Sequence, residues 1–561
     1  MLDPRILRAL NAQRQQAESR KTFYETVTKV MLHDKEWLKR KRIVVCCDGT
    51  SSDDIQPSNR TNVALIHHAL KDLSDDGVEQ KTYYIPGCGT GHNWWLNLNN
   101  ARTGNDMPNK ILEAYLKISS VYESTYDQIF LVGFSRGAHI AKCVARFIHD
   151  FGILRKAPDT TAKQYSESVE RYFNLWLASL TKLANDDVEL SVEVDPKDEE
   201  LLIRNARIRA CALFDTVDTM LKVVPFSTSS MLFTPNKVLN AIDSRVCKNI
   251  DHAIQALALN EHRDLFRHVS WYRDDFEKQA AGRQLRQCWF YGYHLHVGGG
   301  GDQDYISVIP LIWMVAQLHE LGLAFDFVKL TKNVESAKPL PDHRERPMLR
   351  SFSSVGSVIS FAGQRVMAMS TKLSNSANDW KYLFWSNAKR TPCRRFQRNA
   401  DTGAFDELPN NDNLANESIH WTVRYFDKKK VLPSPPFPNG STFFKDESGS
   451  WAWRIPGRVP TDSSSDADTV PEAPCHDSEI MLLHQWYDEL YRKIKKELAD
   501  GKQPDKQVSL VRHVLHALRP VVKDLHGETC TTRTIARAVV DGTKKRVAHK
   551  KRRGKEGTKD R

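Results

Sequence analysis

The chain of 561 residues lacks the features that mark membrane, fibrous or disulfide-bonded proteins. It has no run of about 18 apolar residues, so no transmembrane helix is predicted. Its 27 glycines and 24 prolines are too few for a collagen-like or low-complexity chain. The ten cysteines include no Cys-x-x-Cys pair with zinc spacing, and residues 1–42 lack the apolar core of a signal peptide. These absences predict a cytoplasmic or nuclear protein with reduced thiols.

The net charge of +12 is concentrated at the end of the chain. Residues 544–561 carry +8, which leaves only +4 for the rest. Glycines at 542, 554 and 557 interrupt any helix there, so residues 542–561 are predicted to be a disordered basic tail. A nuclear localisation signal, a tether to an anionic membrane or nucleic acid, and a solubilising tail are all compatible with this segment.

Short apolar runs alternate with amphipathic segments along the first 330 residues. Strands are predicted at 43–47, 81–85, 128–132, 208–214 and 287–291, and helices at 62–73, 109–122 and 137–151, the last with Gly152 as its C-cap. Alternation of strands and helices predicts an α/β fold with a mostly parallel sheet and helices on both faces. The adjacent Cys46 and Cys47 should point to opposite faces of that sheet.

Composition divides the chain further. We expect a helical N-terminal segment at 1–40, an α/β-hydrolase-like catalytic domain at 41–330 with an insertion at 155–205, and a linker-rich accessory or lid region at 331–476. A C-terminal helical segment follows at 477–530, with helices at 479–498 and 508–525, before the tail. Short strands are also predicted at 421–426 and 451–453.

The motif that carries chemistry is Gly133-Phe134-Ser135-Arg136-Gly137. It follows an apolar strand and opens a helix, which is the strand–turn–helix context of a nucleophile elbow. Glycines on both sides allow the tight turn, and the helix N-terminus directs N–H groups at the serine oxygen. A tight turn with an incidental serine is the alternative interpretation.

A serine nucleophile needs a histidine base and an acid that orients it. Asp215 ends the strand at 208–214, and His294 follows the strand at 287–291, so the order Ser135, Asp215, His294 is that of α/β-hydrolases. The competitors are Asp218 and His296.

The N–H groups of the oxyanion hole are expected from two turns. Arg136 follows the nucleophile, and Gly49 and Thr50 follow the first strand. A plain strand-end turn is an equally good interpretation of residues 48–50.

Several segments together resemble one family. They are 43–50, 61–63, 86–90, 133–138, 214–217, 256–263, 294–300 and 312–314. The set resembles the α/β-hydrolase-like catalytic domain shared by class-one type VI secretion lipase effectors and uncharacterised fungal proteins. The resemblance covers about residues 40–327 and implies a phospholipase with a Ser135, Asp215, His294 triad. Three residues depart from the family pattern: Tyr291, His296 and Asn260. The segment that contains His420 resembles a segment of the fungal members, and His420 is a distant second candidate for the base.

The remaining motifs favour no cofactor. The glycine run 298–301 lacks the P-loop pattern and is interpreted as a loop beside the site, and Asp302 and Asp304 are interpreted as solvated rather than as metal ligands. The sequence therefore predicts a serine ester hydrolase, phospholipase- or lipase-like, that needs neither metal nor cofactor and binds an ester or lipid substrate. The alternative is a catalytically inactive α/β-hydrolase-fold scaffold that recruits partners.

Overall fold

A computed structural model of the chain describes the α/β region and parts of the segments that follow it. The described residues are 39–49, 52, 60–88, 107–183, 192–217, 245–261, 268, 270–272, 284–300, 305–330, 390, 392, 396–398, 405–407, 416–428, 437, 440–455, 469–473 and part of 476–501. The predicted N-terminal helical segment up to residue 38, the helix at 508–525 and the basic tail lie outside these residues.

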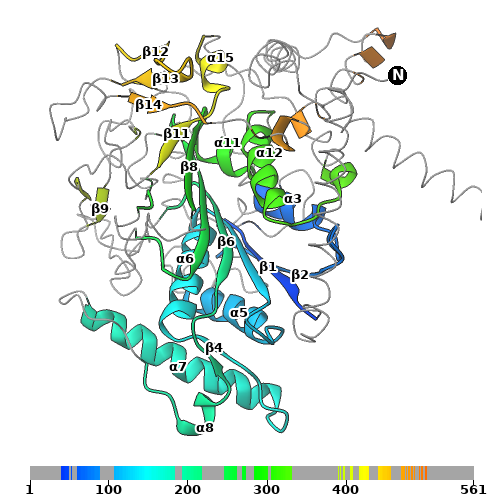
Figure 1. Ribbon diagram of the computed structural model, residues 1–561, viewed down its shortest axis with the longest axis vertical. Helices are drawn as coiled ribbons and strands as arrows, with labels where there is room; N and C mark the ends of the chain where they lie inside the picture. The colour runs from blue at the N-terminus through cyan, green and yellow to red at the C-terminus, as the bar shows by residue number, and fades with distance from the viewer. Residues whose placement is uncertain are drawn as a thin grey trace, which may run out of the picture.

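The centre of the fold is a seven-stranded sheet in the order β11-β8-β7-β6-β3-β1-β2 (Figure 1). Every neighbouring pair in it is parallel. The strands are β1 (Lys41–Cys47), β2 (Glu79–Ile85), β3 (Gln128–Phe134), β6 (Ile208–Phe214), β7 (Ile250–Ala258), β8 (Gln284–Phe290) and β11 (Glu417–Ile419). The predicted mostly parallel α/β fold is therefore confirmed.

Helices cover both faces of the sheet. On one face lie α3 (Asn62–Ala69) and α12 (Tyr305–Glu320), and on the other lie α5 (Met107–Ser119) and α6 (Arg136–Asp150) (Figure 1). The central strands β1, β3 and β6 supply alternate residues to the two cores, because successive side chains point to opposite faces. Cys46 belongs to the first core and Cys47 to the second, as predicted.

The predicted insertion at 155–205 contains a long helix, α7 (Ala162–Leu183), together with α8 (Pro196–Glu199) and β5 (Leu202–Ile203). β5 pairs antiparallel with β4 (Ile153–Leu154). Trp176 of α7 packs on Phe147 of α6 at 5.0 Å between ring centroids, and its indole N–H donates to Asp150 at 2.8 Å. The insertion therefore adds buried side chains to the hydrophobic core on the side of the sheet covered by α5 and α6.

Several predicted elements need correction. The strand predicted at 421–426 is wrong: Trp421 and Thr422 form a turn and α15 (Val423–Lys428) begins there. Val423 and Phe426 are buried three residues apart, which is the spacing of one helical face. The strand predicted at 451–453 is confirmed as β13 (Trp451–Arg454), which lies between β12 (Thr442–Lys445) and β14 (Thr469–Pro471). Two strands of the central sheet, β7 and β11, were not predicted.

Helix α6 begins at Arg136 and ends at Asp150, with Phe151 rather than Gly152 at the C-cap. The helix at 62–73 is shorter than predicted, because α3 ends at Ala69. In the described part of 476–501, helical residues occur at 478–480, 482, 483, 486, 492, 495, 496 and 499, all but the first and last of them inside the helix predicted at 479–498.

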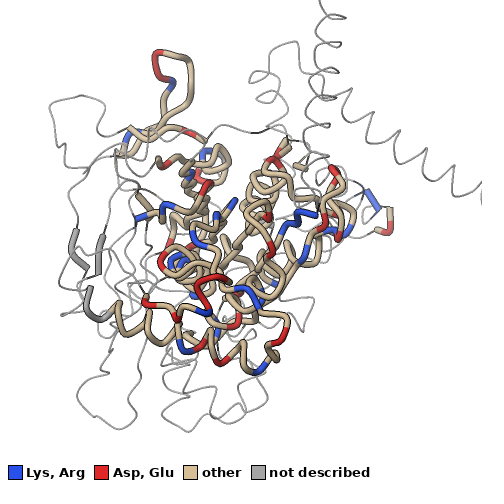
Figure 2. The backbone as a smooth tube through the Cα atoms, turned by 60° about the horizontal axis from the view of Figure 1, so that its bottom comes forward, with Lys and Arg blue, Asp and Glu red and all other residues tan. Residues whose placement is uncertain are grey.

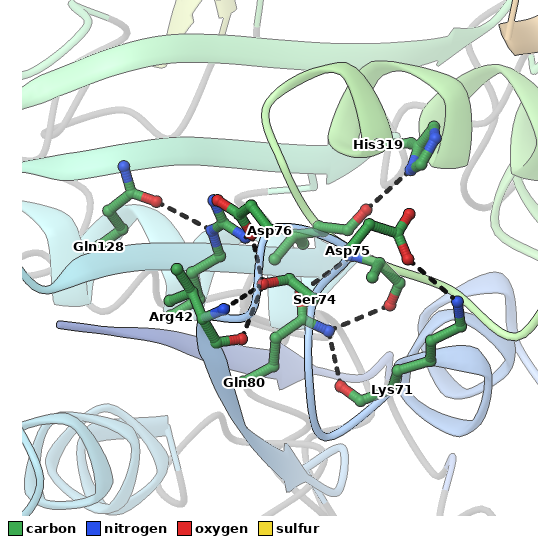
Figure 3. Close-up of polar contacts among 11 residues, drawn as sticks. Arg42, Lys71, Ser74, Asp75, Asp76, Gln80, Gln128 and His319 are labelled. Atoms are coloured by element: carbon green, nitrogen blue, oxygen red, sulfur yellow. Dashed lines mark hydrogen bonds and ion pairs between the residues drawn. The ribbon is translucent and has the colours of Figure 1, made fainter. Parts of the chain in front are cut away.

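Hydrogen bonds from Arg42, called the Arg42 cluster below, hold the turn before β2 against the start of β1 (Figure 3). Arg42 donates to both carboxylate oxygens of Asp76, at 2.7 and 2.8 Å, and to Gln128 at 3.0 Å. These bonds from Arg42 lower the pKa of Asp76 to about 2. The Arg42 cluster lies at the amino ends of the strands, and the serine motif follows the carboxyl end of β3, so we assign this cluster a structural role.

Acidic and basic residues are mixed over the described part of the chain, and α7 carries both (Figure 2). Among the described residues, no helix has both the length and the apolar character needed to cross a membrane.

Candidate active site

Ser135 lies in the turn between β3 and α6. Its backbone has φ 56° and ψ −123°, a conformation that costs energy for any residue with a Cβ atom. Two neighbouring bonds hold the turn: the Ser135 N–H donates to Phe214 O at 3.0 Å, and the Ser135 carbonyl accepts from Ala138 N at 3.1 Å. The hydroxyl makes no capping bond to its own helix, so it is available to other groups.

The two glycines of the motif are required by close backbone contacts. A Cβ atom on Gly133 would lie 2.6 Å from Ala138 Cα, and one on Gly137 would lie 2.2 Å from Cys47 O. Both distances are far below van der Waals contact. Gly133 therefore lets α6 turn back on β3, and Gly137 lets α6 approach the end of β1.

Asp215 follows the end of β6, beside β3 in the sheet. It has φ 42° and is fully buried. Its N–H donates to Ala256 O at 2.8 Å, and one carboxylate oxygen accepts from Ala258 N at 2.9 Å. The neighbouring strand β7, which the sequence did not predict, thus fixes both the backbone and the carboxylate of Asp215.

His294 is the first residue of α11 (His294–Gly298), which follows β8. The preceding turn is held by Asn260, whose side-chain oxygen accepts from Gly292 N at 2.8 Å. The His294 N–H donates to the Glu261 carboxylate at 3.3 Å, and the imidazole packs on the Phe134 ring with centroids 4.7 Å apart. The departure from the family pattern at Asn260 therefore directly contacts the turn that presents His294.

The structure brings the three predicted side chains together. His294 Nδ1 lies 2.6 Å from a carboxylate oxygen of Asp215, and His294 Nε2 lies 2.8 Å from Ser135 Oγ. With the ring proton on Nδ1, the imidazole donates to the carboxylate and accepts from the hydroxyl. Ser135 is 7% exposed and His294 is 3% exposed, so this chain of hydrogen bonds is nearly enclosed.

A fourth side chain, Arg390, reaches this chain of hydrogen bonds from far along the sequence. Its guanidinium donates to both carboxylate oxygens of Asp215, at 2.5 and 3.2 Å, and to Ala258 O at 3.0 Å. Burial alone would raise the pKa of Asp215, but the charge of Arg390 and the bonds from His294 and Arg390 hold it well below its usual range. No sequence motif indicated Arg390, because its role depends only on this distant contact.

The two described residues among the predicted oxyanion donors, Arg136 and Gly49, lie in different surroundings. Arg136 N and Gly137 N open α6, where helix N–H groups have no partner within the helix. The Gly49 N–H instead donates to the carboxylate of its neighbour Asp48 at 2.6 Å. Thr50 lies outside the described residues.

Asp48 organises the turn after β1. Besides the Gly49 N–H, its carboxylate accepts from Thr61 Oγ at 2.7 Å and from the Tyr84 hydroxyl at 2.5 Å. Thr61 also caps α3 by accepting from Ala64 N at 3.1 Å. The polar residues of the first turn thus connect β1, α3 and β2 next to Gly137.

Asn62, the first residue of α3, connects the region around Asp48 to α11, the helix that begins at His294. Its side-chain amide donates to Val297 O at 2.8 Å and to Ser307 O at 2.9 Å. Gly298 approaches the Phe134 ring so closely that a Cβ atom there would lie 1.9 Å from a ring carbon. The described part of the glycine run therefore packs beside Ser135 and His294 and shows no helix N-terminus of the P-loop kind.

The competing residues occupy other roles. His296 Nδ1 accepts from Tyr293 N at 2.9 Å and so caps α11. His420 is fully buried and uses both ring nitrogens, with Thr422 Oγ at 2.8 Å and Glu479 at 2.9 Å. Asp218, Asp302 and Asp304 lie outside the described residues.

Metal ligands and cysteine thiols are the other groups of the described residues that could carry chemistry. Among the described residues, no three His, Cys, Asp or Glu side chains are grouped so as to hold a metal ion. No disulfide joins any two of the described cysteines, and burial raises the pKa of the Cys46 and Cys47 thiols. Such thiols are poor nucleophiles.

The parallel sheet and the Ser135, His294 and Asp215 cluster define an α/β-hydrolase-like domain. Residues 41–317 match the model of the family described as "T6SS, Phospholipase effector Tle1-like, catalytic domain". This part of the chain is similar to that family, which confirms the resemblance predicted from the sequence and supports a phospholipase-like hydrolase domain.

Individual relatives share smaller parts. "Uncharacterized protein YEL023C" of Saccharomyces cerevisiae is 30% identical over 145 residues, which are 24% of this chain and 21% of that protein. An uncharacterized protein from Pseudomonas aeruginosa has a solved structure that aligns with 94% of this chain and 67% of its own, at 15% identity and a TM-score of 0.32. The Tle1 effector bound to the VgrG spike of the type 6 secretion system aligns over 48% and 52%, at 16% identity and a TM-score of 0.23. These TM-scores are too low to support an argument about this chain.

Proposed function

We propose that the α/β domain is a serine hydrolase of carboxylic esters, with phospholipids as the substrate class. The observation that carries the proposal is the hydrogen-bonded series Asp215, His294, Ser135 at a strained strand–helix turn. The family match at 41–317 supports the lipid substrate through its description as a phospholipase effector domain.

In this mechanism Ser135 Oγ attacks the ester carbonyl while His294 Nε2 takes its proton. The imidazolium then gives that proton to the departing alcohol, which leaves an acyl group on Ser135. Water attacks the acyl-enzyme by the same route in reverse, with His294 again as the base. Asp215 keeps the imidazole in the correct tautomer and stabilises its positive form.

The oxyanion that forms on the carbonyl needs N–H donors. We assign one to Arg136 N, at the N-terminus of α6, where the helix dipole also favours negative charge. Gly49 N can act as the second donor only after releasing Asp48. The turn at Gly49 is therefore the part of the oxyanion hole that must rearrange when substrate binds.

The test is labelling of the full chain by a fluorophosphonate probe, followed by hydrolysis of a short-chain nitrophenyl ester and of phosphatidylcholine vesicles. Ser135→Ala should abolish labelling and both activities while the fold is retained. A matched control is Ser119→Ala, since Ser119 is a buried serine of α5 whose bonds go to Leu116 O at 3.3 Å and to the Tyr165 side chain rather than to His294 or Asp215. The control should label and turn over like the unmodified protein.

Three outcomes would contradict the proposal in different ways. Labelling that persists in Ser135→Ala would place the nucleophile elsewhere. No labelling of the unmodified protein would favour the alternative, an α/β-hydrolase-fold scaffold without activity. Ester hydrolysis without release of lysophospholipid or fatty acid from vesicles would support the serine mechanism but contradict phospholipids as the substrate class.

A further inference from the structure

Arg390 makes the most extensive contact with the proposed catalytic acid of any described side chain outside residues 41–317. It is 5% exposed, and Asp215 is fully buried. Two guanidinium nitrogens bond the two carboxylate oxygens, and one of them also bonds Ala258 O. The planar fork of arginine fits this arrangement, whereas the ammonium group of lysine is a point charge.

The bonds to Asp215 account for its complete burial. One oxygen accepts from Ala258 N and Arg390, and the other accepts from His294 and Arg390. A buried carboxylate without a partner is strongly unfavourable, so the arginine stabilises the ionised form that the imidazole needs.

The same contact has an opposing electrostatic effect on His294. A carboxylate stabilises a neighbouring imidazolium by its negative charge, and a cation bound to that carboxylate weakens this effect. Ser135 contacts His294 at Nε2, and Glu261 accepts from its backbone N–H. Among the hydrogen bonds of the described residues to the Asp215–His294 pair, those from Arg390 bring a permanent positive charge.

We propose that Arg390 is a positioning residue for the Asp215–His294 pair: it fixes the carboxylate and, by partly neutralising it, makes the imidazole release its proton more readily. The inference rests on the proposed function. It also means that the α/β domain matched by the family model depends on an arginine from beyond that match. Charge and geometry are separate contributions, so different substitutions can distinguish them.

The experiment uses the full chain with R390M, R390K and R424M. R390M removes the charge with little change in volume, and R390K keeps the charge but loses the fork. R424M is the matched control, because Arg424 forms a buried pair with Glu472 in the same part of the chain and does not contact Asp215.

Activity is followed as kcat/KM for a soluble ester against pH. In R390M the acid limb should move to higher pH by about one unit, because the unneutralised carboxylate holds the imidazolium more strongly. In R390K the limb should stay near that of the unmodified protein, while kcat/KM falls about tenfold through loss of alignment. R424M should change neither.

A second measurement does not depend on turnover. The His294 ring can be titrated by NMR in protein with ring-labelled histidine, and H294Q identifies its signal. The titration midpoint should rise in R390M and stay in place in R390K and R424M. This result would support the inference even if the unmodified protein were not labelled by the fluorophosphonate probe, an outcome that contradicts only the proposed function.

The inference is overturned if R390M leaves both the acid limb and the His294 titration where they are in the unmodified protein. If R390M does not fold, R390K decides: a kcat/KM equal to that of the unmodified protein would show that the fork positions nothing.

Discussion

Replacing His294 and His296 separately distinguishes a proposed base from a structural cap only two residues away. His294 bridges Asp215 and Ser135 at 2.6 and 2.8 Å, whereas His296 accepts one bond from Tyr293 N at 2.9 Å. His294→Ala should lower kcat/KM for a soluble ester by about 10⁴-fold or more, as loss of a triad member does.

The expected cost of His296→Ala follows from the bond it removes. A side-chain cap stabilises a helix by about 0.5–2 kcal/mol, and α11 has only five residues, so the loss should loosen its first turn. If all of that free energy were lost from the transition state, kcat/KM would fall by about 2- to 30-fold, since 1.36 kcal/mol corresponds to tenfold. The two substitutions should therefore differ by at least two orders of magnitude.

The assay is initial rates on a short-chain ester, together with the rate of fluorophosphonate labelling. Thermal unfolding of each variant gives the part of the loss that is due to folding. If His296→Ala damages turnover as much as His294→Ala, or more, the assignment of the base is wrong. If both variants lose activity only because part of the protein is unfolded, the assignment of His294 as the base is also refuted. Replacing the base must lower the activity of the folded protein.

Three further predictions concern other parts of the chain. Gly137→Ala should destabilise the fold by about 1–3 kcal/mol and abolish labelling, because its Cβ would lie 2.2 Å from Cys47 O; unchanged stability in denaturant would contradict this. His420→Ala should cost about 3–5 kcal/mol by leaving Glu479 buried and unpaired, yet the folded fraction should still be labelled. Deleting 544–561 should leave soluble-ester turnover unchanged but alter location in the cell or salt-dependent binding to anionic vesicles; collapse of turnover would refute it.

The sequence predicted the triad residues because each is set by local context. Ser135 lies between an apolar strand and a helix, and Asp215 and His294 follow strands whose carboxyl ends share one edge of the sheet. A parallel sheet brings such positions together regardless of the length and conformation of the loops between the strands. The structure accordingly joins these three side chains, while their catalytic roles stay a prediction.

The parts that were missed depend on contacts distant in sequence. β7 reads Ile-Asp-His-Ala-Ile-Gln-Ala-Leu-Ala, in which polar residues and alanines obscure a strand. It is a strand because β6 and β8 pair with it on both sides, and Gln255 is fully buried there. Arg390 has no local pattern at all, and only the folded chain shows which carboxylate it meets.

The structural support for Asp215 and His294 therefore differs from that for Ser135. Ser135 is held by β3, α6 and a bond to the neighbouring strand β6, all within residues 41–317. Asp215 relies on Arg390, and β8, which leads into His294, is covered at its outer edge by β11. The carbonyl of Trp289 in β8 accepts from His420 N at 2.9 Å, and the His420 ring in turn bonds Glu479. The later segments of the chain are thus part of the framework that aligns Asp215 and His294, and a boundary drawn at residue 330 would separate these segments from the domain that contains Ser135.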